Sequence, residues 1–125
     1  MSNLSDDFFE KMLLFFPFLL DEYENHIKKY GNRLETIIIE DIFMPEVVEL
    51  LKKERDENLL QDIFLYFETL VDSSDKDFLN IFSITAMEIL GNDKEILDKA
   101  KKYMGVKTAQ LQLEADRELG RKRES

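Results

Sequence analysis

The segment from Glu57 to Met104 constrains the fold of this 125-residue chain more than any other, because it reads as three amphipathic helices in a row. Only two short interruptions, at 72–74 and 91–92, separate these helices. Helices joined by turns of two or three residues must lie antiparallel to one another. The segment therefore predicts stacked helical hairpins.

Apolar side chains at helical spacing predict which faces of these helices are buried. Between positions 60 and 71 they recur at i, i+3, i+4 and i+7, which indicates one buried face. Residues 75–90 are apolar around most of the circumference, so we expect a central helix packed on several sides. After Val106 the chain is more polar and carries only a thin apolar stripe, which predicts a last helix at the edge of the fold.

Capping and proline signals divide the first half of the chain. Ser5, followed by two aspartates, predicts the start of a first helix. Pro17 suits the first turn of a new helix, so we expect a bend there, and Gly31 predicts the end of that second helix. Met44 precedes Pro45 and is biased away from helical backbone angles, so we place a boundary there and a new helix after it.

The segment 34–43 is the ambiguous part of the chain. Its three successive isoleucines favour extended structure. The run is short, however, and no second clear strand is present to pair with it. Helical and extended structure both stay open for this segment, and we favour helical or irregular structure.

These patterns together predict an all-α fold. We expect a single domain over residues 1–120 with six or seven helices in antiparallel helical hairpins, either as a HEAT-like solenoid fragment or as a compact bundle. A chain of this size buries about 65% of the surface that its unfolded form exposes. Residues 121–125, which include three basic side chains, are expected to form a short basic disordered tail.

Charge and hydropathy narrow the class of partner. Residues 1–98 carry 23 acidic and nine basic side chains, whereas residues 99–125 carry four and eight. An acidic body repels a phosphate backbone, so we expect a basic protein partner and no nucleic acid.

The N-terminus lacks the basic segment of a signal peptide, and the apolar run 12–20 is interrupted and shorter than the ~20 residues of a membrane span. We therefore expect a cytoplasmic protein that does not insert into membranes.

Few residues offer catalytic or metal-binding chemistry. Cysteine is absent, and His26 is the only histidine, one helical turn after Glu22. The adjacent acids Glu40 and Asp41 could form half of a carboxylate site, but nothing in the sequence identifies the other half, and a capping or solvated role is the preferred interpretation. We predict no catalytic residue, no cofactor and no bound metal.

A pattern of caps and apolar positions in the C-terminal third resembles a family of small, acidic, functionally uncharacterised bacterial proteins. The residues that carry the resemblance are Gly91-Asn92-Asp93-Lys94-Glu95-Ile96-Leu97, Ala100, Tyr103-Met104-Gly105 and Lys107-Thr108. The upstream order of Glu40-Asp41, a helix begun by proline and the 59–71 helix is similar as well, so the likeness covers residues 8–115. The resemblance implies an all-α domain of bacterial origin, and it provides no catalytic residue to transfer.

The sequence predicts a non-enzymatic protein-binding module, with an immunity-type or antitoxin-type inhibitor of a basic toxin as its sharpest version. The alternative is a small carboxylate-dependent enzyme or metal binder that uses Glu40, Asp41 and His26. The N-terminal segment is rich in phenylalanine, and Phe9 and Phe16 are its candidate interaction residues. We expect this aromatic cluster to pack mostly inside the monomer, with a homodimer as the competing outcome.

Overall fold

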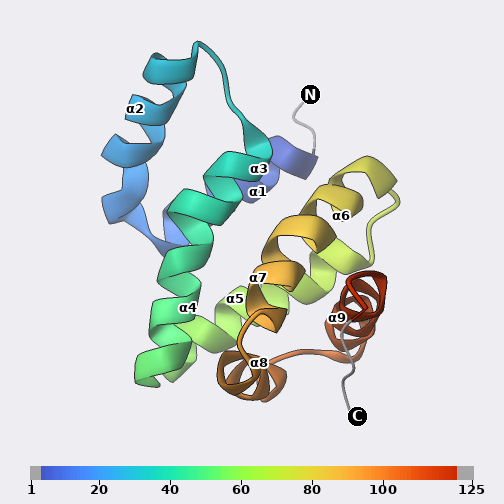
Figure 1. The fold of residues 1–125 in the computed structure, drawn as a ribbon. Coiled ribbons are helices and arrows are strands. Elements are labelled where there is room, and N and C mark those ends of the chain that lie inside the picture. The colour runs from blue at the N-terminus through green and yellow to red at the C-terminus, as the bar shows by residue number, and fades with distance from the viewer. Residues whose placement is uncertain (1–3, 121–125) are drawn as a thin grey trace.

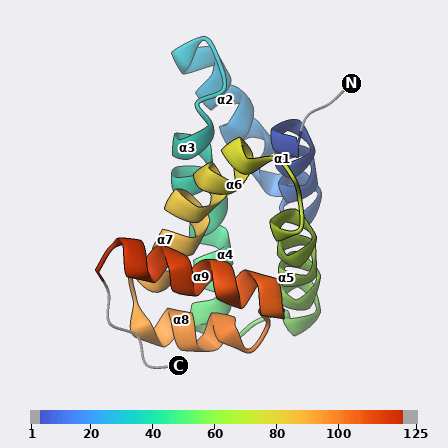
Figure 2. The same ribbon diagram turned by 90° about the vertical axis from the view of Figure 1, so that its right-hand side faces the viewer.

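A computed structural model describes residues 4–120, and within that range the chain is an all-α domain of seven helices without a strand (Figures 1 and 2). Two of the seven helices contain a π-helical turn, so they are divided into shorter labelled pieces. The prediction of an all-α domain with six or seven helices is confirmed. The HEAT-like arrangement is not confirmed.

The first two helices follow the predicted bend at proline. Helix α1 (Leu4–Phe15) is followed by the 3₁₀ turn η1 (Pro17–Leu19) and by α2 (Leu20–Tyr30). Gly31 ends α2 in the left-handed conformation (φ 78°), as its position predicted. Helix α2 has no fully buried residue, and Figure 1 shows it at the edge of the molecule.

Residues 35–53 form one continuous helix, made of α3 (Glu35–Ile38), the π-helical turn η2 (Ile39–Phe43) and α4 (Met44–Lys53). The ambiguous segment is therefore helical. The predicted boundary at Met44 is wrong, since this residue has helical angles (φ −66°, ψ −32°) and its N–H donates to the Ile39 carbonyl, five residues back. In a regular α-helix the ring of Pro45 would press on the carbonyl four residues earlier, and the wider π-helical register directly before the proline relieves that conflict.

The predicted central helix is also continuous. Helix α5 (Glu57–Val71) is followed by α6 (Lys76–Phe82), the π-helical turn η3 (Ser83–Met87) and α7 (Glu88–Gly91), which fold back along α5 (Figure 1). Turn η3 packs against η2 on one side and against the last helix on another. Its central position is confirmed by the side chains that this helix buries, namely Phe78, Phe82, Ser83, Thr85, Ala86, Met87 and Leu90.

Two further helices complete the domain. Helix α8 (Lys94–Lys101) packs on α4 and α7, whereas α9 (Val106–Glu118) packs on α5, η3 and α7. Figure 2 shows both crossing the direction of α5. Aspartate side chains cap three helix starts: Asp56 accepts from the N–H of Leu59 (3.2 Å), Asp75 from Phe78 (3.0 Å) and Asp93 from Glu95 (2.9 Å).

The start of α9 is capped by a residue of another helix. Both carboxylate oxygens of Glu68 on α5 accept backbone hydrogen bonds, Oε2 from Lys107 (2.9 Å) and Oε1 from Thr108 (2.8 Å). The buried hydroxyl of Thr108 also donates to Oε1 (2.7 Å). Gly105 leaves room for this carboxylate, because a Cβ there would lie 2.4 Å from Glu68 Cδ. Glu68 thus joins α9 to α5.

The core is a cluster of phenylalanine rings from α1, η2, α5 and α6. The ring of Phe8 lies 5.4 Å from that of Phe78 and 5.9 Å from that of Phe82, and Phe67 lies 5.0 Å from Phe82, centroid to centroid. Such offset and edge-to-face contacts add to the free energy gained from burying the rings themselves. Among residues 4–120, no helix has the length and apolar character that a membrane span requires.

Candidate protein-binding surface

The two predicted interaction residues of the aromatic segment are buried. Phe9 is 1% exposed and Phe16 is 2% exposed. The Phe9 ring packs on Tyr23 (6.0 Å) and Phe43 (5.9 Å), and the guanidinium of Arg33 covers it at 4.8 Å. Neither ring is therefore available to a partner, and the expectation that this cluster packs mostly inside the monomer holds for both.

The predicted polar candidates do not form a site in the described residues. Glu40 and Asp41 are exposed on η2, and His26 is half-buried on α2 with its ring 4.7 Å from that of Tyr30. Within residues 4–120 no group of three or more histidine, aspartate or glutamate side chains lies close enough together to hold a metal ion. The predicted tail at 121–125 lies outside the described residues.

Several large apolar side chains outside the predicted site residues project into solvent, and three of them lie on α1, η1 and α5. Leu14 and Phe18 are each 68% exposed, and Leu65 is 66% exposed. Leu14 and Phe18 belong to the same aromatic segment as the predicted residues, and Leu65 lies outside the buried stripe of α5. For Leu65, the position outside the apolar stripe was the signal in the sequence that its side chain is exposed.

Two hollows share Phe15, and Phe18 and Leu65 are among the side chains that line them. The first, of about 300 Å³, lies between α1 and α5 and is lined by Lys11, Phe15, Asp62, Leu65, Tyr66 and Thr69. The second, of about 240 Å³, lies between the end of α1, η1, α4 and the start of α5 and is lined by Phe15, Phe16, Phe18, Glu46, Glu49, Leu50, Lys53, Arg55, Asp56 and Leu59. We call the two together the α1–α5 groove. It has an aromatic floor and a charged rim.

The elements that form the groove are acidic, with ten acidic and four basic side chains in residues 4–19 and 44–71. The side chains that line the groove are more nearly balanced: four are acidic, namely Glu46, Glu49, Asp56 and Asp62, and three are basic, namely Lys11, Lys53 and Arg55. Two of those basic groups are already engaged: Lys11 Nζ lies 5.2 Å from the Phe15 ring centroid, and Lys53 Nζ lies 2.8 Å from Glu49 Oε1. Burial, with the charge of Asp7, raises the pKa of Tyr66 to about 12, so its phenol stays neutral at physiological pH.

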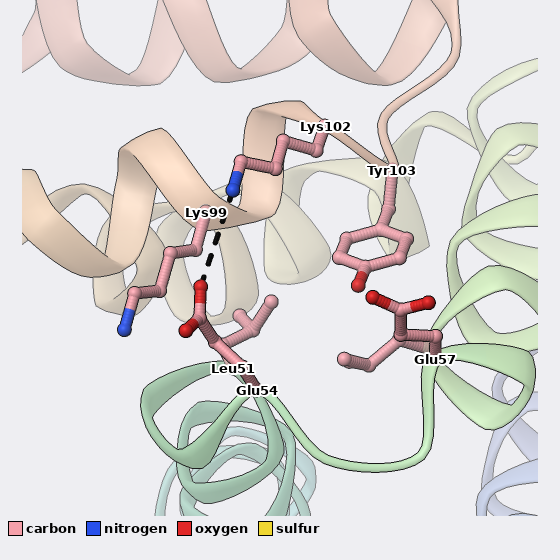
Figure 3. Close-up of a pocket in the computed structure, with 7 residues that line it drawn as sticks. Leu51, Glu54, Glu57, Lys99, Lys102 and Tyr103 are labelled. Atoms are coloured by element: carbon pink, nitrogen blue, oxygen red, sulfur yellow. Dashed lines mark ion pairs between the residues drawn. The ribbon is translucent and has the colours of Figure 1, made fainter.

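A second, smaller concavity lies between α4, the start of α5 and α8. It measures about 210 Å³ and is lined by Leu51, Glu54, Glu57, Leu60, Lys99, Lys102 and Tyr103 (Figure 3). Its cations hold α8 against α4: Lys102 Nζ lies 4.0 Å from Glu54 Oε1, and Lys99 Nζ donates to the Lys52 carbonyl at 3.1 Å. Burial, together with the charges of the two glutamates, raises the pKa of Tyr103. These contacts indicate that the charged side chains of the cleft serve to hold α8 against α4.

Glu54 beside this cleft has an uncommon backbone conformation. It ends α4 in the left-handed region (φ 52°, ψ 44°), where glycine is favoured. The Arg55 N–H donates to the Leu50 carbonyl at 3.1 Å, which completes a Schellman-type helix end. The left-handed conformation costs a residue with a side chain about 1–2 kcal/mol. The ion pair between Glu54 and Lys102 joins two well-exposed side chains, so it offsets little of this conformational cost.

Comparison with curated proteins and with solved structures finds no match to this chain. A family model described as "Domain of unknown function (DUF7674)" matches residues 9–119, from α1 to the end of α9. The matched range includes both walls of the α1–α5 groove and the start of α9 that Glu68 caps. The chain therefore belongs to the DUF7674 family of domains of unknown function.

Proposed function

We propose that this chain is a non-enzymatic protein-binding module whose contact surface is the α1–α5 groove and its apolar rim. The observation that carries the proposal is the exposure of about two-thirds of each of Phe18 and Leu65, which line the groove, and of Leu14 on α1. Burying one such side chain fully is worth about 1.5–3 kcal/mol. A partner that covers all three side chains would gain the free energy of burying them, and aromatic residues such as Phe18 are enriched at protein interfaces.

Charge indicates which kind of partner fits. The chain has a formal net charge of −10 at pH 7, so a second copy of it would bring like charges together. A basic partner is attracted instead, and charge complementarity speeds its association. The sharpest form of the proposal is an immunity-type or antitoxin-type protein that covers the active surface of a basic toxin.

No observation in residues 4–120 favours the alternative of a carboxylate-dependent enzyme or metal binder. Glu40 and Asp41 are exposed on η2, and His26 lies against Tyr30 on α2. The geometry therefore supports the binding module better than a reaction at these residues.

Affinity capture from cells of the source organism tests the proposal when it is run with matched variants. The test variant replaces Leu14, Phe18 and Leu65 by serine, and the control replaces two exposed residues, Val106 at the start of α9 and Leu119 directly after its end, in the same way. We expect a basic protein, identified by mass spectrometry, to be retained by the parent and the control and lost by the test variant. Capture of no protein at low salt, or equal capture by all three chains, contradicts the proposal.

A further inference from the structure

We propose that α9 opens and closes as a unit while the rest of the domain stays folded, and that Glu68 controls this opening. The inference goes beyond the proposed function, because none of the residues that line the α1–α5 groove lies on α9. Its basis is the chemistry of the interface that α9 makes with α5, η3 and α7, together with the origin of its N-terminal cap.

The interface of α9 is mostly polar. This helix of 13 residues buries four side chains, and Ala115 is the one apolar member of a set that also contains Thr108, Gln112 and Asp116. Helix α8, with 8 residues, buries three side chains, and all three are apolar. The hydrophobic effect grows with the apolar area that is removed from water. Burial therefore holds α9 less firmly than it holds the shorter α8.

The polar contacts of α9 add little to its attachment. Gln112 Nε2 donates to the Met87 carbonyl of η3 at 2.9 Å and to Asp116 Oδ1 at 3.3 Å, whereas Gln112 Oε1 is buried without a hydrogen-bond partner in residues 4–120. Water replaces such hydrogen bonds on opening, and it also solvates the buried oxygen. The ion pair between Lys107 and Asp72 joins exposed side chains and contributes little.

Docking provides the cap that α9 needs to be helical. Gly105, directly before the helix, has no side chain with which to cap it. The carboxylate of Glu68 accepts from the backbone N–H groups of Lys107 and Thr108 instead. A helix of this length is only marginally stable in water by itself. Undocking removes the cap and the packing together, so α9 unfolds when it leaves α5, and the two events form one transition.

The place of α9 in the fold allows this transition without loss of the core. It is the last helix of the described residues, and Figure 2 shows it on the outside of the molecule. The buried phenylalanine rings of the core come from α1, η2, α5 and α6, so their cluster stays assembled when α9 leaves. Opening uncovers the surfaces of α5, η3 and α7 against which α9 packs.

Thiol labelling measures the opening, because the chain contains no cysteine and each variant then has a single thiol. The test variant is Ala115→Cys on α9, and the matched control is Ala100→Cys on α8. The two alanines are 1% and 0% exposed, and cysteine is a small apolar replacement. A buried thiol reacts only when its surroundings open. We expect the Ala115→Cys thiol to react more than about tenfold faster than the control, at a rate that low urea concentrations barely change.

A second substitution tests the role of Glu68. In the Ala115→Cys background, Glu68→Ala should speed labelling more than about fivefold, whereas Asp62→Asn on the same helix should leave the rate unchanged. An unchanged rate in the Glu68→Ala variant would show that this cap does not hold α9 closed, and it would overturn the inference.

Hydrogen exchange of the parent chain gives an independent measurement that requires no substitution. Amides of residues 110–118 should exchange more than about tenfold faster than those of residues 61–71 in α5, with a weaker dependence on urea. Equal protection of the two helices, or equal labelling of the two thiols with the same urea dependence, would show that α9 opens only when the whole domain unfolds. Either result overturns the inference and leaves the proposed binding function untouched.

Discussion

The cap that Glu68 places on α9 allows a quantitative stability test. Substitution of Glu68 by alanine leaves the N–H groups of Lys107 and Thr108 and the buried Thr108 hydroxyl without their acceptor. Loss of a helix N-cap costs about 0.5–2 kcal/mol, and a single hydrogen bond to a charged group is worth about 1.5–3 kcal/mol. Because water can replace the acceptor at exposed Lys107, we expect a loss of about 2 kcal/mol in the free energy of unfolding.

Gly105→Ala provides the second arm of a double-mutant cycle. Its Cβ would lie 2.4 Å from Glu68 Cδ and 2.5 Å from Oε1, so the carboxylate would have to leave its donors. The backbone of Gly105 (φ −77°, ψ 175°) is ordinary for alanine, which makes the carboxylate the obstacle. We expect a cost of about 1–2 kcal/mol in the parent and nearly none in the Glu68→Ala background, a coupling of about 1–2 kcal/mol.

Urea unfolding followed by circular dichroism measures these energies, with Asp62→Asn as a charge-matched control on the same helix. Burial acts to raise the pKa of Glu68, but the hydrogen bonds from Thr108 and Lys107 outweigh it and leave the pKa below its ordinary value. The stabilising contribution is therefore complete above the unfolded pKa of about 4.3 and lost as pH falls through the lower folded pKa. Strictly additive costs, or a loss under about 0.5 kcal/mol for Glu68→Ala, would refute the reasoning.

Three further predictions concern the core, a helix end and the binding surface. Phe82→Ala should cost about 3–5 kcal/mol in urea unfolding, because the ring is fully buried among three others, and a cost under 1 kcal/mol would contradict the central position of its helix. Glu54→Gly should stabilise the domain by about 1 kcal/mol by relieving the left-handed backbone, and a loss of stability would show that its side chain contributes more than the exposed ion pair indicates. Serine at Leu14, Phe18 and Leu65 should change the free energy of unfolding by less than about 0.5 kcal/mol per site, whereas a larger loss would show that these side chains serve the core.

Much of the fold follows from local sequence signals. The apolar stripe of α5 and the nearly all-round apolar helix after it predicted buried faces, and the buried Phe64, Phe67 and Phe82 confirm them. Gly31 ends α2 in the left-handed conformation, as expected from residue type. The cap of α8 is Asp93, and aspartate is one of the residue types preferred at helix starts. Periodicity and capping depend on neighbours within one or two helical turns, which is why the sequence alone reveals them.

The features that sequence reasoning missed depend on contacts between distant segments or on an unusual backbone register. The residue before a proline is normally excluded from a helix, and only the π-helical turn η2 lets the chain continue through Met44. Glu68 caps α9 across some 40 positions of sequence, so no local motif marks it. Helical propensity is a weak guide at such points because packing elsewhere overrides it.

The candidate surface could be located only in part. The aromatic segment was recognised, but its helix is apolar on several sides, and periodicity does not say which side faces the body. The structure buries Phe9 and Phe16 and leaves Leu14 and Phe18 exposed, as it does Leu65 on α5. The join between α1 and α5 is a tertiary contact, and the groove exists only after it has formed.

Hydrogen exchange of the domain with and without its captured partner tests the proposed binding surface most directly. The account predicts slower exchange over residues 11–18 and 59–69, the two walls of the α1–α5 groove, with α2 and the far end of α9 unchanged. Protection that falls instead on η2 around Glu40 and Asp41, or on the cleft between α4 and α8, with no change along α1 and α5, would contradict it.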